Sequence, residues 1–140
     1  MIVINSDPVI YFDVDDTLVI WHAASEDQQK YGVEFTCPGT RYIDDDTGKM
    51  KQYPSYKQIL IPHQKHIEQL KKHKARGDKI VVWSAGGWEW AESVVKTLGL
   101  ESHVDLVISK PTWFYDDLPA EEFMHKISNC WVKDYYMEEE

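Results

Sequence analysis

The sequence predicts an α/β fold in which a doubly wound, mainly parallel sheet forms the middle of three layers. Three short apolar runs rich in β-forming residues, at Val9–Phe12, Lys79–Trp83 and Val104–Ile108, have the composition of buried parallel strands. Two helical patterns separate them, one from Pro62 to Gly77 and one at Trp88–Leu98. Strands that alternate with helices in this way are typical of a parallel sheet covered by helices.

Both helical patterns carry an apolar face and signals for their ends. The first begins with a proline, which suits a first helical position, and stops at a glycine. The apolar face of this first helix holds Ile67 and Leu70. The second helix is expected to end before Gly99. The apolar face of the second helix is formed by Ala91, Val94, Val95 and Leu98. The basic run Lys71–Arg76 is interpreted as a solvated end of the first helix, where the helix dipole favours cations.

Three shorter elements are expected after the third strand. The pattern predicts a very short fourth strand at Trp113–Tyr115, a short helix at Glu121–Ile127 and an edge strand at Cys130–Lys133. The fourth strand would bring Asp116 and Asp117, which follow it, to the same edge of the sheet as the residues that follow the other strands.

The stretch from about residue 20 to residue 61 lacks the periodicity of the rest of the chain. Within it, Arg41–Ile43 and Met50–Tyr53 flank Asp44–Gly48, which has the composition of a turn. We therefore predict a small β-hairpin inserted into a single domain that spans residues 1–140.

Composition narrows the class of protein. The chain has 140 residues and a formal charge of −9, which disfavours extended binding to nucleic acid. It has no run of about 18 apolar residues that would cross a membrane, and its first residues lack a signal-peptide pattern. Cys37 and Cys130 are expected to be reduced thiols in a cytoplasmic protein. The sequence is compatible with an oligomer as well as with a monomer.

Polar residues follow every predicted strand. Asp13–Thr17 follow the first strand, Ser84–Gly87 the second, Ser109–Pro111 the third, and Asp116 with Asp117 the fourth. A single Asp after a strand is commonly a cap or a turn former. Several carboxylates at one edge repel each other unless a cation or a lysine offsets their charge. A hard cation with oxygen ligands would offset this repulsion, and Mg²⁺ typically takes one or two carboxylates together with water and substrate phosphate.

These residues resemble the motifs of a known enzyme superfamily. Phe12–Leu18 resembles the DxDxT motif of the haloacid dehalogenase-like (HAD) superfamily. Ser84, Lys110 and the pair Asp116–Asp117 resemble its second, third and fourth motifs, in the same order. The resemblance covers about Val9 to Asp117. It implies a HAD-like Rossmannoid fold, and the hairpin loosely resembles the minimal cap of small members.

The resemblance also implies a reaction, the hydrolysis of a phosphomonoester by a Mg²⁺-dependent phosphatase through an aspartyl-phosphate intermediate. Asp13 would be the nucleophile and Asp15 the general acid and base. Thr17 would orient the loop and Asp15. Ser84, Ala85 and Lys110 would bind the phosphoryl group.

The implied ligands of Mg²⁺ are the carboxylates of Asp13 and Asp116 and the backbone carbonyl of Asp15. Asp117 is expected to contact the ligands of the metal and not the metal itself, although a helix cap is an alternative role for it. Asp16 is expected to belong to the turn.

Two alternatives to a hydrolase stay open. A phosphotransferase or phosphomutase would use the same intermediate, and a non-catalytic Mg²⁺-binding interaction module would keep the same fold. The substrate class is open too. Trp88 is a candidate for stacking on a base or sugar, and Trp90 fits the buried helix face. Four residues of the insertion are candidates for the leaving-group side, although packing and surface contacts explain each of them more simply: Trp21, His22, Arg41 and Tyr42.

Overall fold

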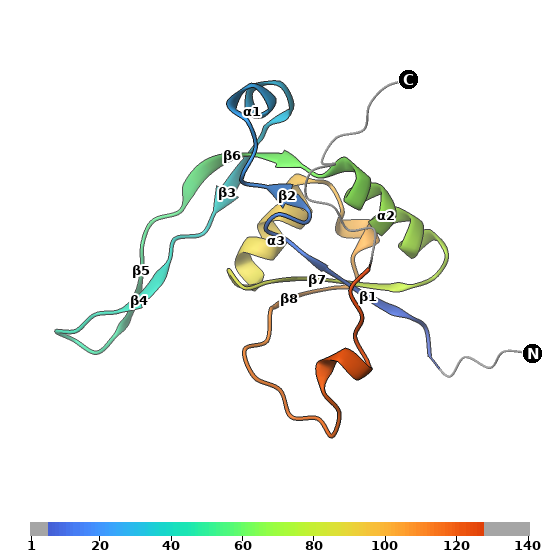
Figure 1. The fold of residues 1–140 in the computed structure, drawn as a ribbon. Coiled ribbons are helices and arrows are strands. Elements are labelled where there is room, and N and C mark those ends of the chain that lie inside the picture. Colours follow the sequence, from blue (N-terminus) through green and yellow to red (C-terminus); the bar gives the residue numbers. More distant parts are fainter. Residues whose placement is uncertain (1–5, 128–140) are drawn as a thin grey trace, which may run out of the picture.

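A parallel sheet of three strands forms the centre of the fold. The computed structural model describes residues 6–127. In it, β1 (Val9–Asp13), β7 (Lys79–Ser84) and β8 (Leu106–Ser109) lie side by side in the order β1–β7–β8 (Figure 1). The predicted α/β class and the three predicted parallel strands are confirmed.

The registers of the strands bring their carboxyl ends to one edge of the sheet. Asp13 lies opposite Trp83, and Ser84 lies opposite Ser109. The residues that follow the three strands therefore begin at the same edge, which is the usual place for ligands in an α/β sheet.

Two helices connect the strands. α2 (Gln64–Ala75) leads into β7, and α3 (Trp88–Thr97) leads from β7 to β8. Both end as predicted, because Gly77 and Gly99 follow them with φ angles of +97° and +68°, a backbone conformation that favours glycine.

Within residues 6–127, α2 and α3 cover one face of the sheet (Figure 1). The strand order moves in one direction from β1 to β7 to β8, and right-handed crossovers then place both helices on the same face. On the opposite face the ring of Tyr11 stacks on the ring of Trp83, with their centres 4.3 Å apart. Val9 and Leu106 on this face are about half exposed. The described residues thus show two layers where three were expected.

The core lies between the sheet and the two helices. Phe12, Ile80 and Val82 of the sheet pack against Leu70 of α2 and Val94 of α3. The remaining core includes Val14, Leu18 and Val19, which follow β1, and Phe35 and Leu60 from the insertion. The loop after Asp13 is therefore anchored by apolar side chains on both sides of its polar residues.

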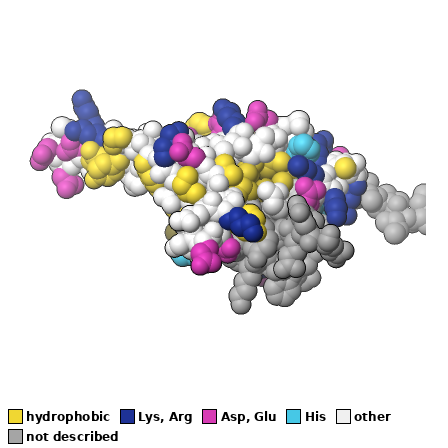
Figure 2. Space-filling view, turned by 90° about the horizontal axis from the view of Figure 1, so that it is seen from above, with side chains coloured by type: hydrophobic (Ala, Val, Ile, Leu, Met, Phe, Trp, Pro, Cys, Tyr) yellow, Lys and Arg dark blue, Asp and Glu magenta, His cyan; other side chains and the backbone are white. Residues whose placement is uncertain are grey.

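The predicted hairpin is confirmed. β4 (Arg41–Ile43) pairs with β5 (Met50–Gln52) in antiparallel register. The hairpin projects from the body, and Figure 2 shows hydrophobic and charged side chains together on it. The hydrophobic residues exposed on and beside the hairpin are Tyr42, Ile43, Met50 and Tyr53.

The rest of the insertion is more regular than its sequence indicates. β2 (Val19–Ile20) and β3 (Val33–Cys37) pair on either side of β6 (Tyr56–Pro62), and α1 (Ser25–Tyr31) lies between β2 and β3. None of these was predicted. α1 buries no residue, and the strands alternate between buried and exposed positions only over short stretches, so the sequence carries little periodic signal.

The expected elements after β8 are not formed as predicted. Trp113–Tyr115 is not a strand, and its side chains are exposed. The expected helix at Glu121–Ile127 is reduced to the 3₁₀ turn Ala120–Glu122. Directly after residue 115 the chain forms a turn in which the Asp116 carboxylate accepts a hydrogen bond from the Leu118 N–H. The edge strand expected at 130–133 lies outside the described residues.

Asp78 joins the end of α2 to the start of β7 through a buried carboxylate. Its side chain is 4% exposed and lies 2.9 Å from His73 Nδ1 and 2.5 Å from Arg76 Nε. Burial raises the pKa of Asp78, but the hydrogen bonds and charges of His73 and Arg76 outweigh burial and hold this pKa below its ordinary value of 3.8.

Asp78→Asn is therefore expected to destabilise the protein at pH 7. A carboxyl whose pKa is lowered by folding stabilises the fold above pH 3.8 and loses that contribution as the pH falls further. Urea unfolding should show a lower midpoint for the variant at pH 7, and the difference from wild type should shrink below about pH 4. Asp45→Asn in the exposed turn is the matched control. Equal midpoints for the two variants at pH 7 would contradict this role of Asp78.

No helix among the described residues is long and apolar enough to span a membrane.

Candidate active site

The loop that follows β1 is a tight turn held by its own backbone. The carbonyl of Val14 accepts hydrogen bonds from the N–H groups of Thr17, Leu18 and Val19 at 3.2, 2.9 and 3.1 Å. Asp16 has a φ of +57°, a conformation that Asp tolerates better than most residues. This turn fixes the backbone on both sides of Asp15.

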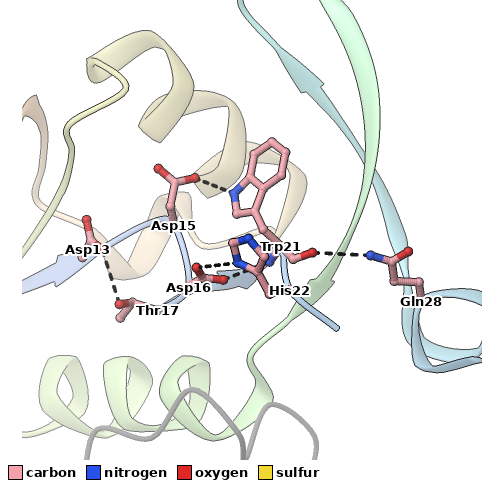
Figure 3. Close-up of polar contacts among 7 residues, drawn as sticks. All are labelled: Asp13, Asp15, Asp16, Thr17, Trp21, His22 and Gln28. Carbon is pink, nitrogen blue, oxygen red and sulfur yellow. Dashed lines mark hydrogen bonds and ion pairs between the residues drawn. The ribbon is translucent and has the colours of Figure 1, made fainter. Parts of the chain in front are cut away.

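The Asp16 carboxylate closes the turn from outside. It accepts a hydrogen bond from the Trp21 N–H at 3.0 Å and lies 3.3 Å from His22 Nδ1 (Figure 3). Asp16 is therefore a turn residue, as the sequence predicts.

Helix α2 supports the same loop. The His63 N–H donates to the carbonyl of Leu18 at 2.9 Å, and His66 Nδ1 lies 2.7 Å from the carbonyl of Thr17. The two imidazole rings are buried and stacked, with their centres 3.6 Å apart. The spacing of these histidines gave no reason to expect contact with the loop, since residues 17 and 66 are far apart in the chain.

Asp13 lies at the end of β1 with a half-buried carboxylate. Its Oδ1 is 3.8 Å from Lys110 Nζ, and its Oδ2 accepts a long hydrogen bond of 3.5 Å from the Thr17 hydroxyl (Figure 3). Burial raises the pKa of Asp13, and the nearby Lys110 charge lowers it without cancelling the rise. Asp13 is thus a carboxylate that is partly stripped of water and has a cation beside it.

Asp15 is held by groups that do not contact Asp13. Its Oδ1 accepts hydrogen bonds from Trp21 Nε1 at 2.7 Å and from Trp90 Nε1 at 2.9 Å, and its Oδ2 lies 3.4 Å from the Ser84 hydroxyl. Trp21 follows β2 and Trp90 belongs to α3, so two separate parts of the chain orient one carboxylate (Figure 3 shows Trp21).

Ser84 ties the ends of β7 and β8 together. Its carbonyl accepts the N–H of Lys110 at 2.8 Å, and its buried hydroxyl accepts the N–H of Gly86 at 3.0 Å. Ala85 follows directly and lines a cleft beside Asp15. The structure therefore brings together five predicted catalytic residues: Asp13, Asp15, Thr17, Ser84 and Lys110. The Thr17 hydroxyl contacts Asp13, whereas the sequence predicted that Thr17 would orient Asp15.

The structure does not bring Asp116 and Asp117 to this group. Both are exposed, and the segment after β8 leaves the sheet as a long loop (Figure 1). The Asp116 carboxylate accepts the Leu118 N–H at 3.0 Å, and the charges that act on the pKa of Asp13 are those of Lys110 and Asp15. The expectation that these two carboxylates share an edge with Asp13 is thus not met, because the fourth strand that would carry them is not formed.

Two of the predicted metal ligands have oxygen atoms that are not taken up by the backbone. The Asp13 carboxylate is partly accessible, and within residues 6–127 no backbone hydrogen bond ends on the carbonyl of Asp15. Mg²⁺ commonly takes one or two protein oxygens and completes its shell with water and substrate phosphate. The described residues contain no cluster of three or more His, Cys, Asp or Glu side chains that would hold a metal by themselves. A Mg²⁺ at this loop would therefore need to take its remaining ligands from water and a bound phosphate.

A cleft of about 620 Å³ opens beside Asp15. One wall consists of Cys37–Arg41 with Gln52 and Tyr56 from the insertion, and the other is the turn Ala85–Gly87 with the start of α3. The sequence placed Trp90 in the core, where it is 5% exposed, but did not predict its hydrogen bond to Asp15. The sequence indicates only that a buried indole N–H usually finds an acceptor, and it does not indicate which acceptor.

This chain matches no protein-family model, no curated protein and no solved structure. Its function is inferred from the residues around Asp13 alone.

Proposed function

We propose that this protein is a Mg²⁺-dependent phosphomonoester hydrolase of the HAD-like type, with Asp13 as its nucleophile. The observation that supports this most strongly is that two carboxylates only two residues apart in the chain have different surroundings. Asp13 has Lys110 beside it, whereas Asp15 is held by Trp21 and Trp90. Two carboxylates in different surroundings are suited to different roles, one as nucleophile and one as acid and base.

The proposed fold is the doubly wound HAD-like arrangement. Its second helical layer would cover the sheet face on which Tyr11 stacks on Trp83. The open apolar face supports this proposal, because a parallel sheet is usually covered on both sides.

The proposed reaction has two steps. In the first, Asp13 attacks phosphorus and forms an aspartyl-phosphate, while protonated Asp15 gives its proton to the departing alcohol oxygen. In the second, Asp15 takes a proton from water, which attacks the aspartyl-phosphate and releases inorganic phosphate. Lys110 and Ser84 hold the phosphoryl oxygens throughout. Bound Mg²⁺, held by Asp13 and the carbonyl of Asp15, would offset the negative charge of the phosphoryl group.

Removal of Mg²⁺ is expected to abolish phosphate release. The full chain should release inorganic phosphate from a panel of phosphomonoesters in the presence of Mg²⁺, fall to the uncatalysed rate with excess chelator, and recover when Mg²⁺ is restored. A phosphorylated acceptor alcohol in place of inorganic phosphate would show a phosphotransferase instead. Absence of turnover over the whole panel, with or without Mg²⁺, would contradict both and favour a binding module.

A further inference from the structure

The cleft beside Asp15 has the dimensions of a small-molecule site. Its volume of about 620 Å³ lies within the range of roughly 300–1,000 Å³ that such sites occupy. Asp15 lines it. Asp13 and Lys110 are not among its lining residues. If Asp15 protonates the leaving oxygen, as the proposed function has it, the cleft therefore lies on the leaving-group side of the site.

Aromatic side chains from three separate segments line the cleft. Trp21 and Trp90 use their N–H groups on Asp15, whereas Trp88 and Tyr56 are 47% and 50% exposed. The backbone N–H of Trp88 donates to the Ser109 hydroxyl at 2.9 Å, which fixes the start of α3. Trp88 and Tyr56 are therefore the aromatic residues of the cleft that are most open to a ligand.

The polar groups of the cleft pair with each other and leave little net charge. Arg41 of the hairpin forms an ion pair with Glu89 of α3, across the two walls. Among the described lining residues, Arg41 is the one basic side chain. A leaving group with further phosphates would meet no unpaired cation there, whereas a neutral group with hydrogen-bonding edges would meet donors and acceptors.

We propose that the cleft binds a nucleoside, so that the substrate is a free nucleoside monophosphate whose base stacks on Trp88 and Tyr56. A sugar alone would cover less of these rings than a flat base does. A single phenol ring would use little of the volume and none of the polar groups at Arg41 and Glu89. A flat heterocycle on a ribose matches both the aromatic walls and the polar edges.

The test compares two esters that share the phosphate and the ribose and differ in the base. For the full chain with Mg²⁺, kcat/KM for adenosine 5′-monophosphate is expected to exceed that for ribose 5-phosphate by about tenfold or more. Trp88→Ala and Tyr56→Leu should each lower this ratio several-fold. Tyr53→Leu, a matched change of an exposed tyrosine outside the cleft, should leave the ratio unchanged.

Equal kcat/KM values for the two esters would overturn the nucleoside site and leave the phosphatase intact. A higher value for a short oligonucleotide with a terminal phosphate would overturn the free nucleotide as substrate. If other phosphomonoesters turn over and neither of these two does, the nucleoside site is overturned. If no ester of the panel turns over, the proposed function fails, and calorimetry still tests the cleft. Tighter binding of adenosine 5′-monophosphate than of ribose 5-phosphate, weakened in Trp88→Ala, would then support the site, and equal binding would overturn it.

Discussion

Asp13→Asn is expected to release phosphate at least about 10⁴-fold more slowly than the wild type, because an amide cannot form the aspartyl-phosphate. Asp16→Asn is the matched control. It makes the same change in the same loop, at a turn position where Asn tolerates the φ of +57° and keeps an oxygen for the Trp21 N–H. Phosphate release by both variants should be measured at saturating Mg²⁺. Retention of more than a few per cent of the wild-type rate by Asp13→Asn would exclude Asp13 as the nucleophile.

Loss of activity in Asp13→Asn should not come from loss of the fold. Burial raises the pKa of Asp13 above its ordinary value of 3.8 despite the opposing charge of Lys110. A carboxyl whose pKa is raised by folding favours the native state less as the pH rises through that pKa, so ionised Asp13 contributes unfavourably to the stability of the native protein. The neutral amide removes this contribution. The urea midpoint of the variant at pH 7 is therefore expected to be no lower than that of the wild type.

The sequence was sufficient to predict the part of the fold that carries the candidate site. Val9–Phe12 and Ile80–Trp83 are apolar throughout, and such runs next to polar residues mark both the strands and the edge where they end. Since neighbouring parallel strands end together, the proximity of Asp13, Ser84 and Lys110 follows from the order of the elements. This part needed no knowledge of side-chain packing.

What could not be predicted depends on contacts between residues far apart in the chain. Trp21 and Trp90 both donate to Asp15, yet nothing in the sequence links position 15 to position 90. α1 and β3 are too polar and too short to show a period. The segment after β8 differs for another reason, because the turn that Asp116 closes outweighs the weak strand signal of three aromatic residues.

Asp15→Asn is expected to slow turnover about 10²- to 10⁴-fold and to make the phosphoenzyme accumulate. The amide cannot protonate the leaving oxygen or take a proton from water, so both steps lose their acid and base. Substrates with a good leaving group need little protonation, and their first step should be affected less than the hydrolysis of the intermediate. Acid quenching during turnover of an aryl phosphate should therefore show labelled phosphate on the variant protein. Unchanged turnover would exclude Asp15 from proton transfer.

The hydrogen bonds from Trp21 and Trp90 make it possible to test the proton of Asp15 and the position of its carboxylate separately. In Asp15→Asn the amide oxygen would still accept hydrogen bonds from Trp21 and Trp90, so this variant tests the proton and not the position of the group. Trp90→Phe does the reverse, because it keeps Asp15 and a ring in the core but removes one donor. A loss of about tenfold in kcat is expected for it, from the roughly 1.5–3 kcal/mol of a hydrogen bond to a charged group partly replaced by water. Trp113→Phe makes the same change at an indole that is 87% exposed and lies outside the cleft, and it is the matched control. A partly unfolded sample would lower the rate without changing the fraction of active protein that carries phosphate. A positioning role for Trp90 requires that this fraction rise, as in Asp15→Asn.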